Sequence, residues 1–194
     1  MNGTFGNLAC KEEPRVEVIG GKVVMLAAPS ALHEVIAGKI YRIFGNYLEK
    51  KRCMAFSSNT AVYLEDGEEY QPDVKVVCDR SKVKHDGIHG APDLVVEVLS
   101  PSTGSYDRGR KMQVYERCGV REYWIVDPVI RSIEQYLLEE GRFVLRDIYM
   151  QLDEEDLKMM SEKRRAEMVK EFHCSLFDDL TISVDDVFAE VGEW

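Results

Sequence analysis

Hydrophobic and polar residues alternate along several short stretches of the chain, and elsewhere a helical spacing replaces the alternation. Valines alternate with polar residues before Gly20-Gly21, which predicts a β-hairpin over residues 15–26. From residue 30 onwards, apolar residues recur every three or four positions. This spacing predicts a helix over residues 30–51 with Ser30 as its N-cap.

The rest of the chain continues as a succession of predicted strands and helices. Short apolar runs bounded by proline or glycine indicate strands, and an amphipathic stretch after Pro101 indicates a helix that ends at Gly119. The expected elements are strands over 70–79, 93–99 and 122–128, a helix over 105–118, a hairpin over 132–149, a charged helix over 152–171, and a closing strand and helix after 180. This order predicts an α/β fold with a central mixed β-sheet flanked by helices.

Length and composition fit one globular domain. The 194 residues are 45% hydrophobic and 31% charged, so we expect a single domain over residues 1–194, with 1–14 as a loose lead-in. The first residues lack the basic start and apolar run of a signal peptide, and no stretch approaches the roughly 18 apolar residues of a membrane span. The five cysteines are widely spaced without a CxxC pair, so neither a zinc site nor a disulfide framework is indicated. We therefore expect a cytoplasmic protein with no membrane partner.

The chain is strongly acidic, with a formal charge of −10. This charge argues against a protein that coats nucleic acid, because neutralising phosphates requires clustered cations. It does not exclude a nucleic-acid enzyme whose carboxylates bind a divalent metal. Residues 104–121 differ from the rest, since they carry a local balance of +3.

A carboxylate stands in the middle of the most apolar predicted strand. Side chains alternate between the two faces of a strand, so Glu97 shares its face with Asp93 and Leu99. A buried carboxylate is costly unless it is paired or bound to a metal. Glu97 is therefore a candidate metal ligand, and the alternative is a structural ion pair with a nearby basic residue.

The preceding strand supplies a second acid. Asp73 follows Pro72 just as Asp93 follows Pro92, so the two strands open in a similar way. If these strands are neighbours, Asp73 and Glu97 converge on one cation, and two carboxylates with water and substrate phosphate suit Mg²⁺. The alternative for Asp73 is that it caps the turn before the strand.

A lysine on the following helix completes the candidate group. Lys111 lies one or two turns into the helix that follows Glu97. From there its ammonium could orient an attacking water and stabilise phosphoryl charge. The alternative is a solvated lysine on the helix surface.

Three stretches of the chain closely resemble one known family. They read "QPDVKVV", "APDLVVEVLSPSTGSYDRGRKMQVYERCGVREYWIVDP" and "FDDLTISVDDVF". They are similar to the Uma2 family, also called DUF820, which is placed in the PD-(D/E)XK, or restriction-endonuclease-like, superfamily. The resemblance covers most of the chain, and relative to it residues 152–171 look like a charged helical insertion. It implies a restriction-endonuclease-like core, a Mg²⁺-dependent hydrolase of phosphodiester bonds, with Mn²⁺ as a substitute, and a homodimer.

By position, the resemblance gives Asp73 and Glu97 the roles of first and second acid of the motif. The superfamily pattern places a lysine two residues after the second acid, where this chain has Leu99. The lysine role is then displaced to Lys111, with Lys75 as a competitor because it follows Asp73 by two residues. Glu34, on the first helix, matches a position where such folds often add an acid to the metal site, and an exposed glutamate is an equal alternative.

Histidines give weaker signals. His33 could assist at the site, although a histidine at a helix start more often packs locally. His85 and His89 are four residues apart, but Gly87 between them makes a zinc-binding helix improbable, so we expect exposed loop histidines.

The sequence thus predicts a metal-dependent endonuclease, with DNA as the expected nucleic-acid partner. Two other functions stay open at this point. One is a catalytically weak or inactive module of the same fold that binds nucleic acid or regulates. The other is a phosphohydrolase of small nucleotides. Fold likeness alone does not choose among substrates.

Overall fold

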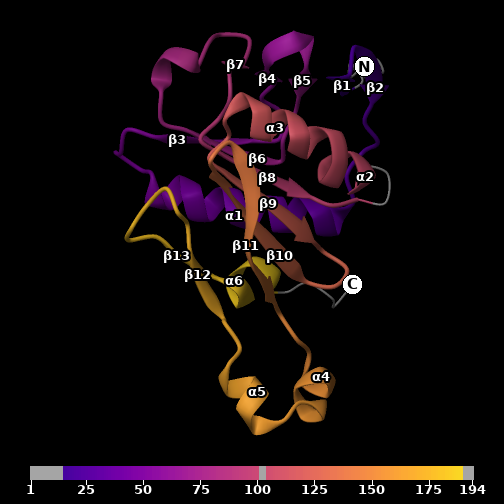
Figure 1. Cartoon of the computed structure of the whole chain (residues 1–194), viewed down its shortest axis with the longest axis vertical. Helices are drawn as coiled ribbons and strands as arrows, with labels where there is room; N and C mark the ends of the chain where they lie inside the picture. The colour runs from indigo at the N-terminus through magenta and orange to yellow at the C-terminus, as the bar shows by residue number, and fades with distance from the viewer. Residues whose placement is uncertain (1–14, 101–103, 190–194) are drawn as a thin grey trace, which may run out of the picture.

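A six-stranded mixed sheet lies at the centre of the computed structural model, which describes residues 15–100 and 104–189 (Figure 1). The strand order is β11-β10-β9-β8-β6-β3. Strands β8 and β9 run parallel, and every other neighbouring pair is antiparallel. The strands are β3 (Met54–Ser57), β6 (Val74–Val77), β8 (Leu94–Val98), β9 (Glu122–Asp127), β10 (Ser132–Glu139) and β11 (Arg142–Met150). The predicted α/β fold with a central mixed sheet is confirmed. A turn at Glu140-Gly141 joins β10 to β11, which form the hairpin predicted over 132–149.

One face of this sheet is covered by the first helix, α1 (Ala31–Tyr47). The hydroxyl of Ser30 accepts a hydrogen bond from the backbone N–H of His33, so the predicted N-cap is confirmed. The helix buries Ile36, Ile40 and Phe44 against the sheet. The same layer holds α6 (Val184–Phe188) and the two-stranded ribbon of β12 (Glu171–His173) and β13 (Thr181–Ser183).

The opposite face of the sheet packs against α3 (Met112–Cys118) and a smaller five-stranded sheet. That sheet has the order β2-β1-β5-β4-β7. Its strands are β1 (Val16–Ile19), β2 (Lys22–Met25), β4 (Val62–Tyr63), β5 (Glu69–Tyr70) and β7 (Ile88–His89). The predicted hairpin over 15–26 is therefore present, and Gly20 and Gly21 take the positive φ angles that its turn requires.

The helix predicted over 105–118 is interrupted by a π-helical turn. Residues 104–106 form a short helix, α2 (Gly104–Tyr106), the π turn spans Asp107–Lys111, and α3 follows. Within the π turn, Asp107 and Lys111 are both buried. Such single-turn bulges occur often at functional sites. The helix ends as predicted at Gly119, which has a φ of 84°.

The prediction of one helix over 152–171 is wrong. Two short helices, α4 (Glu154–Met159) and α5 (Glu162–Ala166), extend away from the sheet beyond the end of β11, and residue 171 begins β12 (Figure 1). Asp153 and Ser161 each cap a new helix start, so the segment breaks into two. Among the described residues, no helix has both the length and the apolar character needed to cross a membrane.

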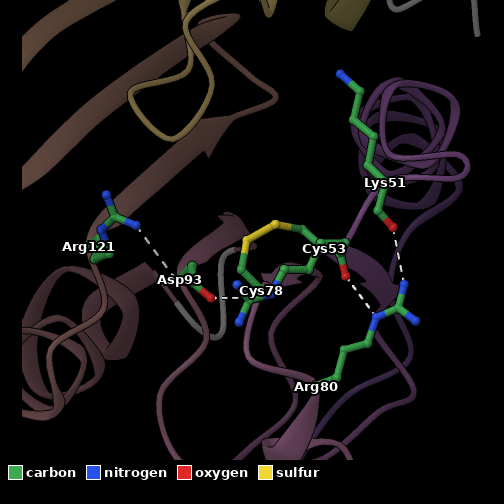
Figure 2. Close-up of a disulfide and its surroundings, with 7 residues drawn as sticks. Lys51, Cys53, Cys78, Arg80, Asp93 and Arg121 are labelled. Carbon is green, nitrogen blue, oxygen red and sulfur yellow. Dashed lines mark hydrogen bonds and ion pairs between the residues drawn. A yellow bond between two sulfur atoms is a disulfide. The ribbon is translucent and has the colours of Figure 1, made fainter.

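A disulfide joins Cys53 to Cys78, although the sequence indicated no disulfide framework (Figure 2). The pairing of Met54 with Val77 across β3 and β6 brings the two cysteines, one residue further out, to a Cα–Cα distance of 3.9 Å. The backbone N–H of Cys78 also donates to Asp93 at 2.7 Å. The two cysteines are 25 residues apart and belong to no spacing motif, so only the strand pairing reveals the bond.

Candidate functional site

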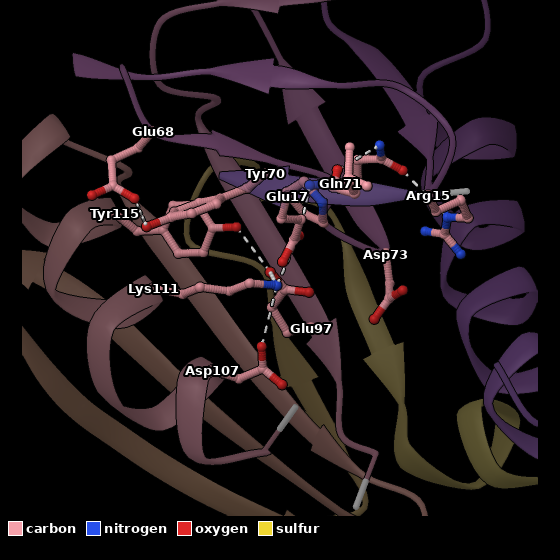
Figure 3. A network of polar contacts seen from close by, with 12 residues as sticks. Arg15, Glu17, Glu68, Tyr70, Gln71, Asp73, Glu97, Asp107, Lys111 and Tyr115 are labelled. Carbon is pink, nitrogen blue, oxygen red and sulfur yellow. Dashed lines mark hydrogen bonds and ion pairs between the residues drawn. The ribbon is translucent and has the colours of Figure 1, made fainter. Parts of the chain in front are cut away.

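A pocket of about 700 Å³ opens where the carboxyl end of β8 meets β1, the start of α1 and the π turn. Its lining includes the predicted Asp73, Glu97 and Lys111. It also includes Glu17 of β1, a carboxylate for which no local sequence pattern indicates a function. Figure 3 shows the Lys111 ammonium among carboxylates, with Asp73 to one side.

Strand pairing explains why the two predicted acids meet. Strands β6 and β8 are antiparallel, with Val74 opposite Val96. One step further along this register, Asp73 approaches the Glu97 end of β8. The Asp73 carboxylate accepts a hydrogen bond from the backbone N–H of Val98 at 2.8 Å, which fixes it beside the strand end. The predicted convergence of Asp73 and Glu97 in one site is therefore present.

His33 contacts Asp73, so it does more than pack at the start of the helix. Its Nε2 lies 3.2 Å from Oδ2 of Asp73, and no described residue hydrogen-bonds its buried Nδ1. Burial lowers the pKa of His33, but the hydrogen bond to Asp73 and the charges of Asp73 and Glu34 outweigh burial and raise the pKa above its usual value. His33 thus holds one oxygen of Asp73 in place.

Glu97 is only 3% exposed and receives two donors on one oxygen. The hydroxyl of Tyr115 donates to Oε1 at 2.8 Å, and the Lys111 ammonium lies 3.2 Å from the same atom. Burial raises the pKa of Glu97 against the opposing charge of Lys111, and nearby carboxylates raise it further. The structure therefore holds a carboxyl group whose proton affinity is abnormally high.

Lys111 is surrounded by three carboxylates. Its Nζ lies 3.0 Å from Glu17, 3.2 Å from Glu97 and 3.3 Å from Asp107. Burial lowers the pKa of Lys111, but the three acids outweigh that effect and raise it. Lys111 is consequently a permanent cation near neutral pH. Asp107 and Lys111 are the first and last residues of the π turn, and both are buried.

Lys75, the competitor for the lysine role, points elsewhere. Its ammonium donates to the backbone carbonyls of Ser57 and Pro72, at 2.7 and 2.9 Å. Burial lowers the pKa of Lys75 to about 7. Lys75 is not among the residues that line the pocket, whereas Lys111 is. The geometry thus favours Lys111 over Lys75.

The structure does not bring Glu34 into this group. Glu34 is exposed on α1, outside the pocket lining, and its neighbour His33 occupies the inward position. His89 lies on the short strand β7, exposed, with Nε2 3.0 Å from Asp86. Within residues 15–100 and 104–189, no group of three or more His, Cys, Asp or Glu side chains is arranged to hold a metal ion.

The basic stretch 104–121 is largely neutralised by acids. Arg108 pairs with Glu134, and Nε of Arg110 lies 3.2 Å from Glu68. Burial alone would raise the pKa of Glu68, but hydrogen bonds from Arg110, Tyr70 and the backbone of Gly20 lower it below its usual value.

Arg117 of the same stretch pairs with Asp66 at 3.2 Å. The +3 balance of the sequence therefore does not become an open cationic surface.

A further buried carboxylate, Glu122, lies on the opposite side of the sheet. Its burial was not predicted from the sequence either. It accepts hydrogen bonds from Trp124 and Gln135, both at 2.6 Å, and from the backbone N–H of Ser175 at 2.8 Å. The thiol of Cys174 approaches it at 3.6 Å. These donors tie β9 to β10 and to the segment before β13, a structural role.

Asp73 and Glu97 have the chemistry that Mg²⁺ requires. This ion is usually held by one or two carboxylates together with water and substrate phosphate, without a full cage of protein ligands. Among described residues, none hydrogen-bonds Oδ1 of Asp73 or Oε2 of Glu97. One oxygen of each carboxylate is thus available, so the residues fit a divalent cation although they form no three-ligand cluster.

Comparisons with known proteins show which proteins the chain is similar to. The Uma2 family model, described as "Putative restriction endonuclease", matches residues 4–164. The uncharacterized protein slr1290 of Synechocystis sp. is 31% identical over 147 residues, covering 75% of this chain and 71% of that protein. The uncharacterized protein sll1609 of the same organism is 26% identical over 124 residues, covering 62% and 70%.

One solved structure has a similar fold. The crystal structure of a DUF820 protein from Anabaena variabilis, titled a "putative nuclease", has a TM-score of 0.69 and 18% identity, with 91% of each chain covered. At this identity the likeness concerns the fold. The family-model match spans most of the sequence, and we conclude that the chain belongs to the Uma2 family.

Proposed function

We propose that this protein is a metal-dependent endonuclease that hydrolyses phosphodiester bonds of nucleic acid, with DNA as the expected substrate. Asp73 and Glu97 are the proposed ligands of Mg²⁺, for which Mn²⁺ can substitute. One observation carries the proposal: the two acids share a pocket with Lys111, whose ammonium lies 3.2 Å from Glu97. The family match supports the same class of activity.

A bound divalent cation would supply charge neutralisation at the phosphate and would lower the pKa of a coordinated water. The chain's own residues prepare the site. The Val98 N–H and His33 fix one oxygen of Asp73, which leaves its other oxygen available to hold a cation. Lys111 cannot serve as a base, since its pKa is raised, so its role is to stabilise negative charge on the phosphate as a cation.

Glu17 and Asp107 act as positioning residues for Lys111. Their carboxylates lie 3.0 and 3.3 Å from its ammonium. If Glu97 bound a metal, Glu17 and Asp107 would still pair with Lys111 and keep its ammonium positioned and charged. The reaction itself needs only water as co-reactant: a water oxygen bonds to phosphorus, one phosphodiester P–O bond breaks, and the leaving oxygen takes a proton.

Calorimetric titration with Mg²⁺ and with Mn²⁺, repeated in the presence of a short oligonucleotide, tests the site. We expect binding by the wild type and its loss in the double variant Asp73→Asn with Glu97→Gln. Glu49→Gln, an exposed carboxylate at the end of α1, is the matched control and should bind as the wild type does. Glu34→Gln tests the additional ligand suggested by the sequence, and its exposed position leads us to expect no change.

Cleavage of labelled DNA and RNA in the presence of each metal then tests the activity. Cleavage that survives in Glu97→Ala, or metal binding with no cleavage of any polymer, would contradict the proposal. The second result would favour a non-catalytic module of the same fold, and turnover of free nucleotides alone would favour a nucleotide phosphohydrolase. For the assembly we propose a homodimer, which sedimentation equilibrium tests directly.

A further inference from the structure

We infer that the strand to be cut enters the pocket unpaired, so that the substrate is single-stranded or locally opened nucleic acid and not a continuous duplex. This inference rests on the proposed function and concerns the substrate of the same pocket. Three features carry it: the depth of the acids, the apolar walls of the pocket, and the lack of a cationic track beside it.

The acids lie at the floor of the pocket. Asp73 is 8% exposed, Glu97 3% and Glu17 1%, so a phosphate must descend between the walls to reach them. The volume of about 700 Å³ lies within the roughly 300–1,000 Å³ of pockets that enclose a small ligand. A nucleotide of a free strand matches this size. A B-form duplex, whose major groove alone is about 12 Å wide, carries its phosphates on a broad outer surface and is far larger than the pocket.

The walls of the pocket are apolar where bases would lie. Residues 26–29, Leu-Ala-Ala-Pro, form one wall after β2. The turn between β9 and β10 forms the other, with Pro128, Val129 and Ile130 in the lining. Val129 is 83% exposed and Ile130 56%, so neither side chain serves the core. Apolar side chains of this kind insert between or against bases once these leave the stack.

The surroundings of the pocket are poorly suited to a duplex. Duplex binding depends on several cations that neutralise phosphates on both strands. The lining offers Arg15 and Arg108 as the arginines of the described pocket, and Arg108 is paired with Glu134. The arginines along the neighbouring helix are also in ion pairs, and the chain carries a formal charge of −10. Few cations are available for phosphate contacts, so contacts to bases must supply part of the substrate-binding energy.

The test compares one labelled sequence in three forms: single strand, full duplex, and a duplex with a central unpaired bubble. With Mn²⁺ or Mg²⁺ present, we expect the single strand and the bubble to be cut roughly tenfold faster than the duplex, the size of one base-stacking contact. The double variant Val129→Ser with Ile130→Ser should reduce this preference and raise KM with little change in kcat. Val23→Ser, which removes a 70% exposed valine outside the pocket lining, is the matched control.

Two results separate this inference from the proposed function. The inference is overturned if the duplex is cut as fast as the single strand. It is also overturned if the Val129 and Ile130 changes leave the preference for the single strand unaltered. Either result leaves the nuclease proposal standing. If no form is cut, the nuclease proposal fails, and fluorescence anisotropy on Asp73→Asn still decides the question of strand preference. Equal or tighter binding of the duplex in that assay overturns the inference, and roughly tenfold tighter binding of the single strand supports it.

Discussion

Replacing Lys111 with methionine removes the buried ammonium and keeps a side chain of similar length. Glu17, Glu97 and Asp107 would then face one another without a cation, although all three lie within 3.3 Å of the present Nζ. Breaking a buried pair by removing one partner costs about 3–5 kcal/mol of unfolding free energy, because the remaining charge stays desolvated. We expect a loss of this size in Lys111→Met at neutral pH.

A double-mutant cycle isolates the Lys111–Glu97 contact. Glu97→Gln alone should cost about 1–2 kcal/mol, since it removes one charged hydrogen-bond partner while Lys111 keeps two acids. The double variant should lose less than the sum of the single variants, with a coupling energy of about 2 kcal/mol. Urea unfolding at pH 9, above the raised pKa of Glu97, measures all four free energies, because both Glu97 and Lys111 are charged there.

The exposed pair Lys158–Glu154 is the control cycle. Its atoms lie 3.5 Å apart, and solvent surrounds both side chains, so its coupling should stay below about 0.5 kcal/mol. If the Lys111 and Glu97 changes were additive within that same margin, the account of the buried cluster would be refuted.

The pH dependence of the unfolding free energy is a second test of the same buried cluster. Burial raises the pKa of Glu97 to about 8, above the ordinary value of about 4.5 that it takes in the unfolded chain. The unfolded chain therefore loses its proton first, and the stability contributed by protonated Glu97 falls as pH rises between these two values. Glu97→Gln should remove this part of the slope, and an unchanged slope would contradict the raised pKa.

Three further predictions concern the fold. Glu122→Gln should cost about 3–5 kcal/mol in urea unfolding, since an amide nitrogen must then face donors that now meet a carboxylate, whereas exposed Glu139→Gln should stay within about 0.5 kcal/mol. Glu68→Gln should flatten the acid limb of the stability profile: its lowered pKa means that its contribution is present above the usual pKa and is lost as pH falls through the folded value. Reduction of the Cys53–Cys78 disulfide should cost about 3 kcal/mol for a loop of this length, and equal melting temperatures of the oxidised and reduced forms would contradict this.

Patterns within single strands predicted much of the site. The alternation along 93–99 turns Val95 toward the α3 side of the sheet and Val96 toward the α1 side, as the structure has them. The same alternation set Glu97 apart as an inward carboxylate. The approach of Asp73 to Glu97 depended on the two strands being neighbours, which only the pairing of β6 with β8 shows. Lys111 was a candidate from its place on the following helix, and the family resemblance favoured it for the lysine role, because nothing in its local spacing separates it from a surface lysine.

Residues whose role depends on distant packing escaped prediction. Glu17 stands in an alternating hairpin, where a polar residue normally faces water, and only the contact with Lys111 from far along the chain explains its burial. Cys53 and Cys78 meet through the register of β3 and β6. His33 turned inward, in place of its neighbour Glu34, because the rotation of α1 is set by the residues that it buries. Contacts between residues far apart in the chain determine these features, so no local sequence pattern predicts them.

The position of α4 and α5, which project as an arm beyond the end of β11, bears on how this protein can diverge (Figure 1). The proposed metal ligands and the lysine of the pocket come from residues 73–111, and the last described residue of its lining is Ile130. No described residue beyond 130 lines the pocket, while the family match runs to residue 164, inside α5. Evolution can therefore lengthen, shorten or re-surface the arm while the chemistry stays constant. Relatives with the same pocket are free to differ most in this appendage.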